Sequence, residues 1–225
     1  MCVSVLRSAY GAGATALKAG ALICLAGPAL AEVTVAALGD SLTHGYGLRQ
    51  DEGFVPQLQA WLDAKGAEVE VINAGVSGDT TAGGLSRVDW TLTDDVDALI
   101  VALGGNDLLR GIDPATSMGN LDGILAAADE AGVEVLLVGM EAPGNYGQDY
   151  KRAFDGMYGD LAAKWGVALS DNTFLGSLMA MEDREAATAT YMQGDGIHPN
   201  AEGVKVVVEA LGPAVLDLVE RAEGD

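Results

Sequence analysis

A serine, a histidine and an aspartate stand in two short segments that could together perform nucleophilic catalysis. Ser41 lies in GDSL (residues 39–42), and DGIHP (residues 195–199) places Asp195 three residues before His198. An aspartate at this spacing can accept a hydrogen bond from one imidazole nitrogen and orient the other toward a serine hydroxyl. Each segment alone is a weak signal, because a serine in a turn is most often a helix cap.

Two further segments offer hydrogen-bond donors of the kind that stabilise a developing oxyanion. NAGVSGD (residues 73–79) is a glycine-rich turn in which Gly75 and Gly78 permit close backbone approach and positive φ. The candidate donor in this turn is the backbone N–H of Gly78. GGND (residues 104–107) offers the side-chain amide of Asn106. A glycine-rich turn and a loop asparagine are usually structural, so these segments gain weight only in combination.

Three of the four segments directly follow a predicted strand. Short apolar or β-branched runs predict five strands, at residues 33–38, 69–72, 98–103, 133–138 and 167–169. Apolar residues at helical spacing predict one helix from Phe54 to a stop at Gly66 and further helices over 80–92, 114–131, 148–165 and 201–219.

Polar and conformationally special residues predict where some of these helices begin and end. Asp79 and Asp113 are the predicted N-caps of the second and third helices, and Gly132 closes the third. Pro199 is predicted to open the last helix, and Pro213 to break or kink it.

The alternation of strands and helices indicates an α/β fold, a parallel sheet with helices on both faces. Right-handed crossovers make such a sheet doubly wound. Because ligands of these folds bind at the carboxyl ends of the strands, Ser41, Gly78 and Asn106 are expected to meet at one edge.

In combination the four segments resemble the GDSL, or SGNH, hydrolase superfamily, whose second name lists residues that correspond here to Ser41, Gly78, Asn106 and His198. The strings GDSLTHGYGL, NAGVSGDTT, LGGNDLLRG, APGNYG and DGIHPNAEG are similar to its periplasmic thioesterase I, lysophospholipase and arylesterase branch. The resemblance runs from Val33 to the last helix. It implies a three-layer flavodoxin-like fold with the strand order 2-1-3-4-5.

The resemblance assigns each residue a role in a two-step ester hydrolysis. Ser41 attacks the acyl carbonyl, while His198 takes the serine proton and later donates it to the leaving group. Asp195 orients the imidazole, and the oxyanion is met by the N–H groups of Ser41 and Gly78 and by Asn106.

Other catalytic motifs are missing from the sequence. The chain lacks the G-x-S-x-G nucleophile motif of ordinary α/β-hydrolases. It also lacks H-E-x-x-H and a Walker loop, so no metal and no cofactor are expected. The only other histidine, His44, follows Ser41 by three residues and is expected at the surface or the cleft rim.

Two loops after the third and fourth strands are expected to bind substrate. Leu108 and Leu109 stand in one loop, Asn145 and Tyr146 in the other. Their apolar content suits an acyl chain, and the family branch implies short- to medium-chain esters, aryl esters, thioesters and lysophospholipids. A carbohydrate O-deacetylase on the same triad and a non-catalytic acyl-binding protein remain the alternatives. The segment 173–189 matches no motif, so its part in the acyl site is open.

Composition narrows the possible partners. The 225 residues hold 12 Lys and Arg against 33 Asp and Glu, a formal net charge of −21. A nucleic-acid binder needs a basic surface, which this excess of acidic residues disfavours. An anionic membrane surface would repel a chain that carries the same sign of charge. We expect a small-molecule ester or acyl substrate, no nucleic acid, no stable membrane insertion, and a monomer or weak oligomer.

The first 31 residues have the features of a secretory signal peptide. Arg7 and Lys18 are the only charged residues before Glu32, an apolar run spans 19–31, and an A-x-A site ends at Ala31. The run is too short to span a bilayer.

Cleavage after Ala31 would leave residues 32–225 as a single exported domain, periplasmic or secreted. Both cysteines, Cys2 and Cys24, lie in the leader, so the mature chain would have no disulfide. A lipoprotein anchored at Cys24 is disfavoured, because Ile23 is large for the preceding position.

Overall fold

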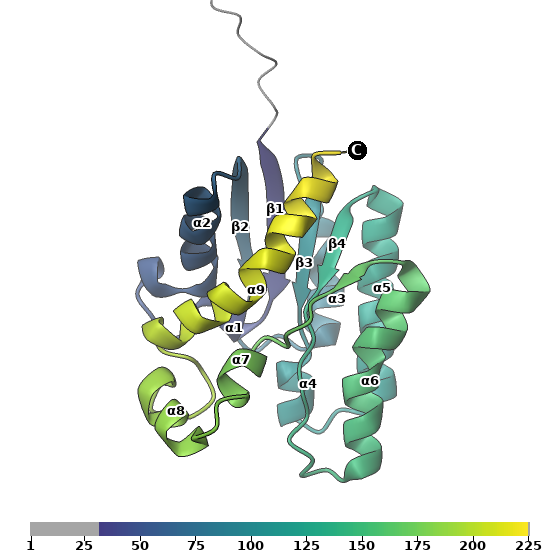
Figure 1. Cartoon of the computed structure of the whole chain (residues 1–225). Helices are drawn as coiled ribbons and strands as arrows, with labels where there is room; N and C mark the ends of the chain where they lie inside the picture. Colours follow the sequence, from purple (N-terminus) through teal and green to yellow (C-terminus); the bar gives the residue numbers. More distant parts are fainter. Residues whose placement is uncertain (1–31, 225) are drawn as a thin grey trace, which may run out of the picture. The chain divides into compact units, whose positions relative to one another are not determined.

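Five parallel strands form one sheet in the computed structural model of this chain, which describes residues 32–224 (Figure 1). The strands are β1 (Val33–Gly39), β2 (Val69–Gly75), β3 (Ala98–Ala102), β4 (Glu134–Leu137) and β5 (Ala168–Leu169). Their order, β2-β1-β3-β4-β5, confirms the expected 2-1-3-4-5 arrangement. The predicted signal peptide and both cysteines lie outside the described residues.

Helices cover both faces of the sheet. On one face, α2 (Phe54–Lys65) packs against α9 (Ala201–Ala222), which also contacts β3 and β4. On the other face, α3 (Thr81–Thr91) packs on α5 (Pro114–Ala131), and α5 packs on α6 (Gln148–Trp165) (Figure 1). Because both faces are covered, every residue of the central strand β3 is buried, which explains its wholly apolar sequence.

Short helices occupy the loops that leave the strands. They are α1 (Ser41–His44), the 3-10 turn η1 (Gln50–Glu52), α4 (Gly105–Leu109), α7 (Gly176–Met179) and α8 (Arg184–Tyr191). In Figure 1, α1, α4, α7 and α8 gather toward the lower end of the sheet, where the strands have their carboxyl ends. Sequence periodicity did not predict these elements, since one or two helical turns are too short to show a period.

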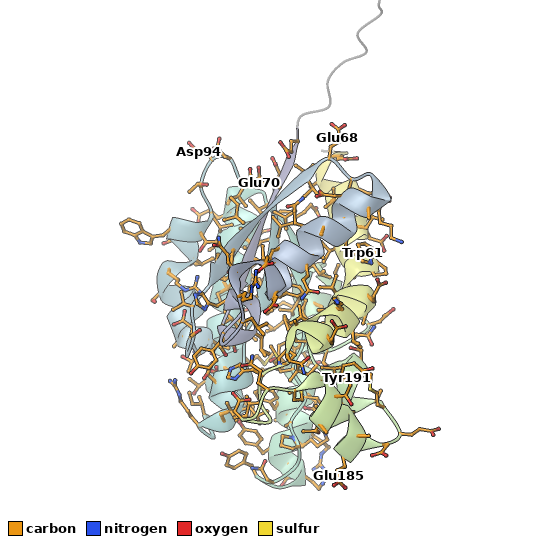
Figure 2. The ribbon with its side chains drawn as sticks, turned by 90° about the vertical axis from the view of Figure 1, so that its left-hand side faces the viewer. Trp61, Glu68, Glu70, Asp94, Glu185 and Tyr191 are labelled. Atoms are coloured by element: carbon orange, nitrogen blue, oxygen red, sulfur yellow. The ribbon has the colours of Figure 1, made fainter. Side chains whose placement is uncertain are left out.

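The packing of α2 on α9 shows how closely these two neighbouring helices approach. A Cβ at Gly212 of α9 would come within 2.9 Å of the Trp61 ring of α2, so a larger residue there would displace the ring. Figure 2 shows Trp61 on this side of the molecule, with acidic side chains such as Glu68 and Glu185 at its outer edges. Of the helices in the described part of the chain, none has the length and apolarity to cross a membrane.

Three predicted helix boundaries were wrong. Thr80, not Asp79, caps α3, because the Asp79 carboxylate pairs instead with Arg87. Helix α9 is not broken at Pro213, since its buried face on both sides of the proline outweighs one missing hydrogen bond. Asn200 caps α9, while Pro199 forms an antiparallel bridge with Met192 before the helix begins.

Candidate active site

The turn between β1 and α1 places Ser41 at the carboxyl edge of the sheet. Strand β1 ends at Gly39, and the Asp40 side chain caps α1 by accepting a hydrogen bond from Leu42 N at 3.0 Å. Ser41 is therefore the first residue of α1 and is only partly buried. Its hydroxyl group faces a cavity that also contains His198.

The predicted triad residues are in hydrogen-bond contact. Ser41 Oγ lies 2.8 Å from Nε2 of His198, and Nδ1 of the same ring lies 2.7 Å from Asp195 Oδ2. With Asp195 accepting from Nδ1–H, Nε2 is left without a proton and can accept the serine proton.

Asp195 is held as an anion. Its Oδ1 accepts hydrogen bonds from the backbone N–H groups of His198 at 3.0 Å and Ile197 at 2.9 Å. The backbone N–H of His198, its ring and the Ile197 N–H lower the pKa of Asp195 to about 2. The carboxylate therefore stays charged at any pH at which the protein would work.

Contacts between the loop of His198 and the turn after α1 bring Ser41 and His198 together, although the two residues are 157 positions apart in the sequence. The Gln193 backbone N–H donates to the His198 carbonyl at 2.7 Å and closes the histidine loop. The Gln193 side chain donates to the Tyr46 carbonyl at 2.8 Å, which ties this loop to the turn after α1. The Tyr46 ring also packs against the imidazole, with 4.8 Å between ring centroids.

The three expected oxyanion donors line the same cavity as the triad. Within residues 32–224, the backbone N–H groups of Ser41 and Gly78 have no hydrogen-bond acceptor. The amide nitrogen of Asn106 donates to Asp40 Oδ2 at 3.2 Å, which leaves its second N–H for a ligand.

The two glycines of the NAGVSGD segment show the positive φ and the close backbone approach that their residue type permits. Gly78 adopts a φ of +88°, which strains any other residue. A Cβ at Gly75 would lie 2.4 Å from the backbone nitrogen of His44, so only glycine lets β2 approach α1 this closely.

A buried aspartate anchors the helix that carries Asn106. The carboxylate of Asp107 accepts hydrogen bonds from Thr81 N at 2.8 Å, Thr81 Oγ1 at 2.6 Å and Ser117 Oγ at 2.8 Å. These contacts join α4 to α3 and α5. Asn106 is thus fixed at the end of β3 by a hydrogen-bond network that involves both neighbouring helices.

Arg87 links the GDSL segment (residues 39–42) to the NAGVSGD segment (residues 73–79). No sequence motif indicated this residue. Its guanidinium donates to the carbonyls of Gly39 at 2.8 Å and Ala74 at 2.7 Å, and pairs with Asp79 at 2.7 Å. The fork of donors on arginine suits three acceptors in fixed positions. Arg87 thereby sets the spacing between the ends of β1 and β2, which precede Ser41 and Gly78.

The cavity has a volume of about 610 Å³, within the usual range for small-molecule sites. Leu108 and Leu109 line it as predicted, but Asn145 and Tyr146 do not. Tyr146 instead contacts the Leu109 carbonyl through its hydroxyl at 3.4 Å, so it braces that loop from outside.

Several lining residues were not predicted. Apolar and weakly polar side chains from the strand ends and the segments after them complete the wall: Met140, Pro143, Thr173, Leu175, Met179, Met192 and Ile197. Three of these belong to the 173–189 segment, which therefore forms part of the cavity wall. Their hydrophobic character was visible in the sequence, but their convergence depends on the fold.

His44 lies outside this cavity, as expected. Its side chain is exposed, and Nδ1 contacts Ser77 Oγ at 3.1 Å. Ser77 lines the cavity, so His44 stands behind its rim and not against Ser41. Among the described residues, no group of His, Cys, Asp or Glu side chains is arranged to hold a metal ion.

Asp40 gives the folded protein a pH-dependent stability. Its side chain is 2% exposed, and burial raises its pKa from 3.8 to about 6. Between these values the folded state binds the proton and the unfolded state does not, so the free energy of unfolding falls as pH rises from about 4 to 6. A shift of about two units corresponds to about 3 kcal/mol.

We expect Asp40→Asn to remove this dependence. Relative to the original protein, the variant should gain up to about 3 kcal/mol in unfolding free energy between pH 4 and pH 8, because only the original protein has a buried carboxylate that ionises over this range. The altered contact with Asn106 is present in the variant at both pH values, so it contributes little to this change. Urea unfolding at pH 4 and pH 8 measures both differences, and equal differences at the two pH values would contradict the buried charge.

The site combines a hydrogen-bonded Ser-His-Asp array with adjacent oxyanion donors at the carboxyl edge of a parallel sheet. This arrangement is typical of the active site of a serine hydrolase. The GDSL-like Lipase/Acylhydrolase family matches residues 37–206, and the chain belongs to this family. It is a carboxylic ester hydrolase.

Individual relatives cover most of the chain. "Esterase TesA" of Pseudomonas aeruginosa is 38% identical over 200 residues, which are 88% of this chain and 95% of that protein. "Thioesterase 1/protease 1/lysophospholipase L1" of Escherichia coli (strain K12) is 33% identical over 201 residues, covering 89% and 91%. The crystal structure of AlinE4, an SGNH-hydrolase family esterase, matches with 43% identity and a TM-score of 0.66, covering 83% of this chain and 96% of that one.

Proposed function

We propose that this chain hydrolyses short- to medium-chain carboxylic esters through an acyl-enzyme on Ser41. The observation that carries the proposal is the continuous contact from Ser41 to His198 to Asp195 inside a mainly apolar cavity. The same cavity offers donors for an oxyanion from Gly78 and Asn106.

The proposed reaction has two steps at one serine. Ser41 Oγ attacks the carbonyl carbon while Nε2 of His198 takes its proton, and the carbonyl oxygen becomes the oxyanion. The intermediate collapses as His198 returns the proton to the departing alcohol, phenol or thiol. Water then attacks the acyl-serine with His198 again as base, which releases the acid and restores the hydroxyl group.

The cavity wall supports an acyl or aryl substrate rather than a sugar. Leucines, methionines and a proline make up much of the lining, and its polar members include Ser41, His198, Asn106 and Glu141. A carbohydrate needs many hydrogen-bond partners along its length. We therefore place aryl esters, thioesters and lysophospholipids ahead of acetylated sugars, in keeping with the names of the relatives.

A series of p-nitrophenyl esters from acetyl to palmitoyl, run beside an acetylated sugar, tests the substrate class. We expect kcat/KM to be highest for short to medium chains and low for the sugar acetate. Preferred release of acetate from the sugar would support the deacetylase alternative. Saturable ester binding without turnover would support a non-catalytic acyl-binding protein, and Ser41→Ala gives the background rate.

We also propose that the protein is exported and cleaved after Ala31. The support is the leader composition described above, together with the absence of cysteine from residues 32–225. Intact mass and N-terminal peptide analysis of protein from its native envelope should give Glu32 as the first residue. A mature chain that keeps Met1 would contradict the proposal.

A further inference from the structure

A buried carboxylate beside the oxyanion donors has no part in the reaction as described. Asp40 is 2% exposed and lines the catalytic cavity. Its Oδ1 caps α1, but its Oδ2 accepts the hydrogen bond from Asn106 Nδ2 at 3.2 Å. A Cβ at Gly105 would lie 3.1 Å from Oδ2, so the start of α4 is closely fitted to this carboxylate.

We propose that Asp40 is a positioning residue, which fixes the Asn106 side chain so that its N–H, and not its carbonyl, faces the oxyanion. This inference rests on the proposed function. An asparagine amide has nearly the same shape when rotated by 180°, so packing alone does not choose between the two orientations. An ionised carboxylate only accepts hydrogen bonds, so it admits only the NH₂ end of Asn106.

The orientation matters because the two ends of the amide have opposite effects on the intermediate. With Asp40 holding one N–H, the second N–H can donate to the oxyanion. A rotated amide would present its carbonyl oxygen to a negative charge and would raise the barrier. Aspartate stands at this position despite its burial, and a helix cap alone does not require the charge, since asparagine caps equally well.

Asp40→Asn separates the two roles of this side chain. The new carbonyl oxygen still accepts from Leu42 N, so α1 keeps its cap. The new NH₂ group, however, faces the NH₂ of Asn106, and two donors cannot bond. We expect kcat on p-nitrophenyl acetate to fall by about 10²-fold, the typical loss for one oxyanion donor, with KM nearly unchanged.

A double-mutant cycle shows whether the loss passes through Asn106. In the Asn106→Ala background, Asp40→Asn should lower kcat by no more than about threefold, because the amide that it would misorient is gone. The matched control is Asp113→Asn, which replaces the aspartate cap of α5 outside the cavity and should leave kcat unchanged. An Asp40→Asn variant with near-normal kcat, or one that loses the same factor in both backgrounds, would overturn the inference.

A second measurement does not depend on turnover. In the NMR spectrum of the Asn106 side-chain amide, we expect one proton shifted downfield by the carboxylate, and the shift lost in Asp40→Asn. An unchanged amide resonance would refute the positioning role even in an active enzyme. Failure of the proposed function would appear separately, as a lack of ester turnover by the unaltered protein.

Discussion

Ser41→Ala and His198→Ala should each lower kcat by about 10⁵- to 10⁶-fold, the loss that removal of a serine nucleophile or its base causes elsewhere. Without Ser41 no acyl-enzyme can form. Without His198 the hydroxyl group keeps its proton, and the leaving group receives none. Because the two residues act as one unit at 2.8 Å, the double variant should be no slower than either single variant.

His44→Ala provides the matched control for the histidine. His44 contacts Ser77 but lies outside the cavity lining, so its loss should leave most of the turnover. Initial rates on a short-chain p-nitrophenyl ester compare the variants. If His198→Ala kept its activity and His44→Ala lost it, the base would be His44, and our assignment of His198 would be wrong.

Asn106→Ala should lower kcat by about 10²- to 10³-fold while KM changes little. The amide N–H meets an oxygen that gains full charge only in the transition state, so its loss raises the barrier more than it weakens binding. Asn106→Asp should be at least as harmful, because it places a second carboxylate beside Asp40, facing the oxyanion.

The fold of both Asn106 variants can be checked directly. Asn106 is partly buried on α4, whose anchor is the neighbouring Asp107, so circular dichroism and the unfolding midpoint should change little. A folded Asn106→Ala protein with near-normal kcat would remove Asn106 from the mechanism.

Local chemistry made much of the fold predictable. The helices at 114–131 and 148–165 have the predicted bounds, because Asp113, Gly132 and Gly166 mark their ends by side-chain capping or positive φ. The strand order came from the family resemblance. The wrong boundaries arise where a contact made in the folded chain outweighed the local preference, as the Arg87 ion pair did at Asp79 and the bridge to Met192 did at Pro199.

The site was predictable where function depends on residue type and less so where it depends on packing. Ser41, His198 and Asp195 were indicated by their segments and prove to be in contact. Asn145 follows a strand but does not line the cavity, because sequence spacing does not encode the direction of a loop. The burial of Asp40 arises only when β1 and β3 meet, so sequence spacing alone could not indicate it.

Covalent labelling by a fluorophosphonate tests the central claim, that Ser41 is an activated nucleophile, most directly. The reagent requires the serine, its base and the oxyanion donors together, and it leaves a stable adduct that mass spectrometry can locate. We predict one adduct per chain on the peptide that contains Ser41, loss of esterase activity in proportion to labelling, and no adduct in Ser41→Ala. Stoichiometric labelling at another residue, or full esterase activity in a protein fully labelled at Ser41, would contradict the account.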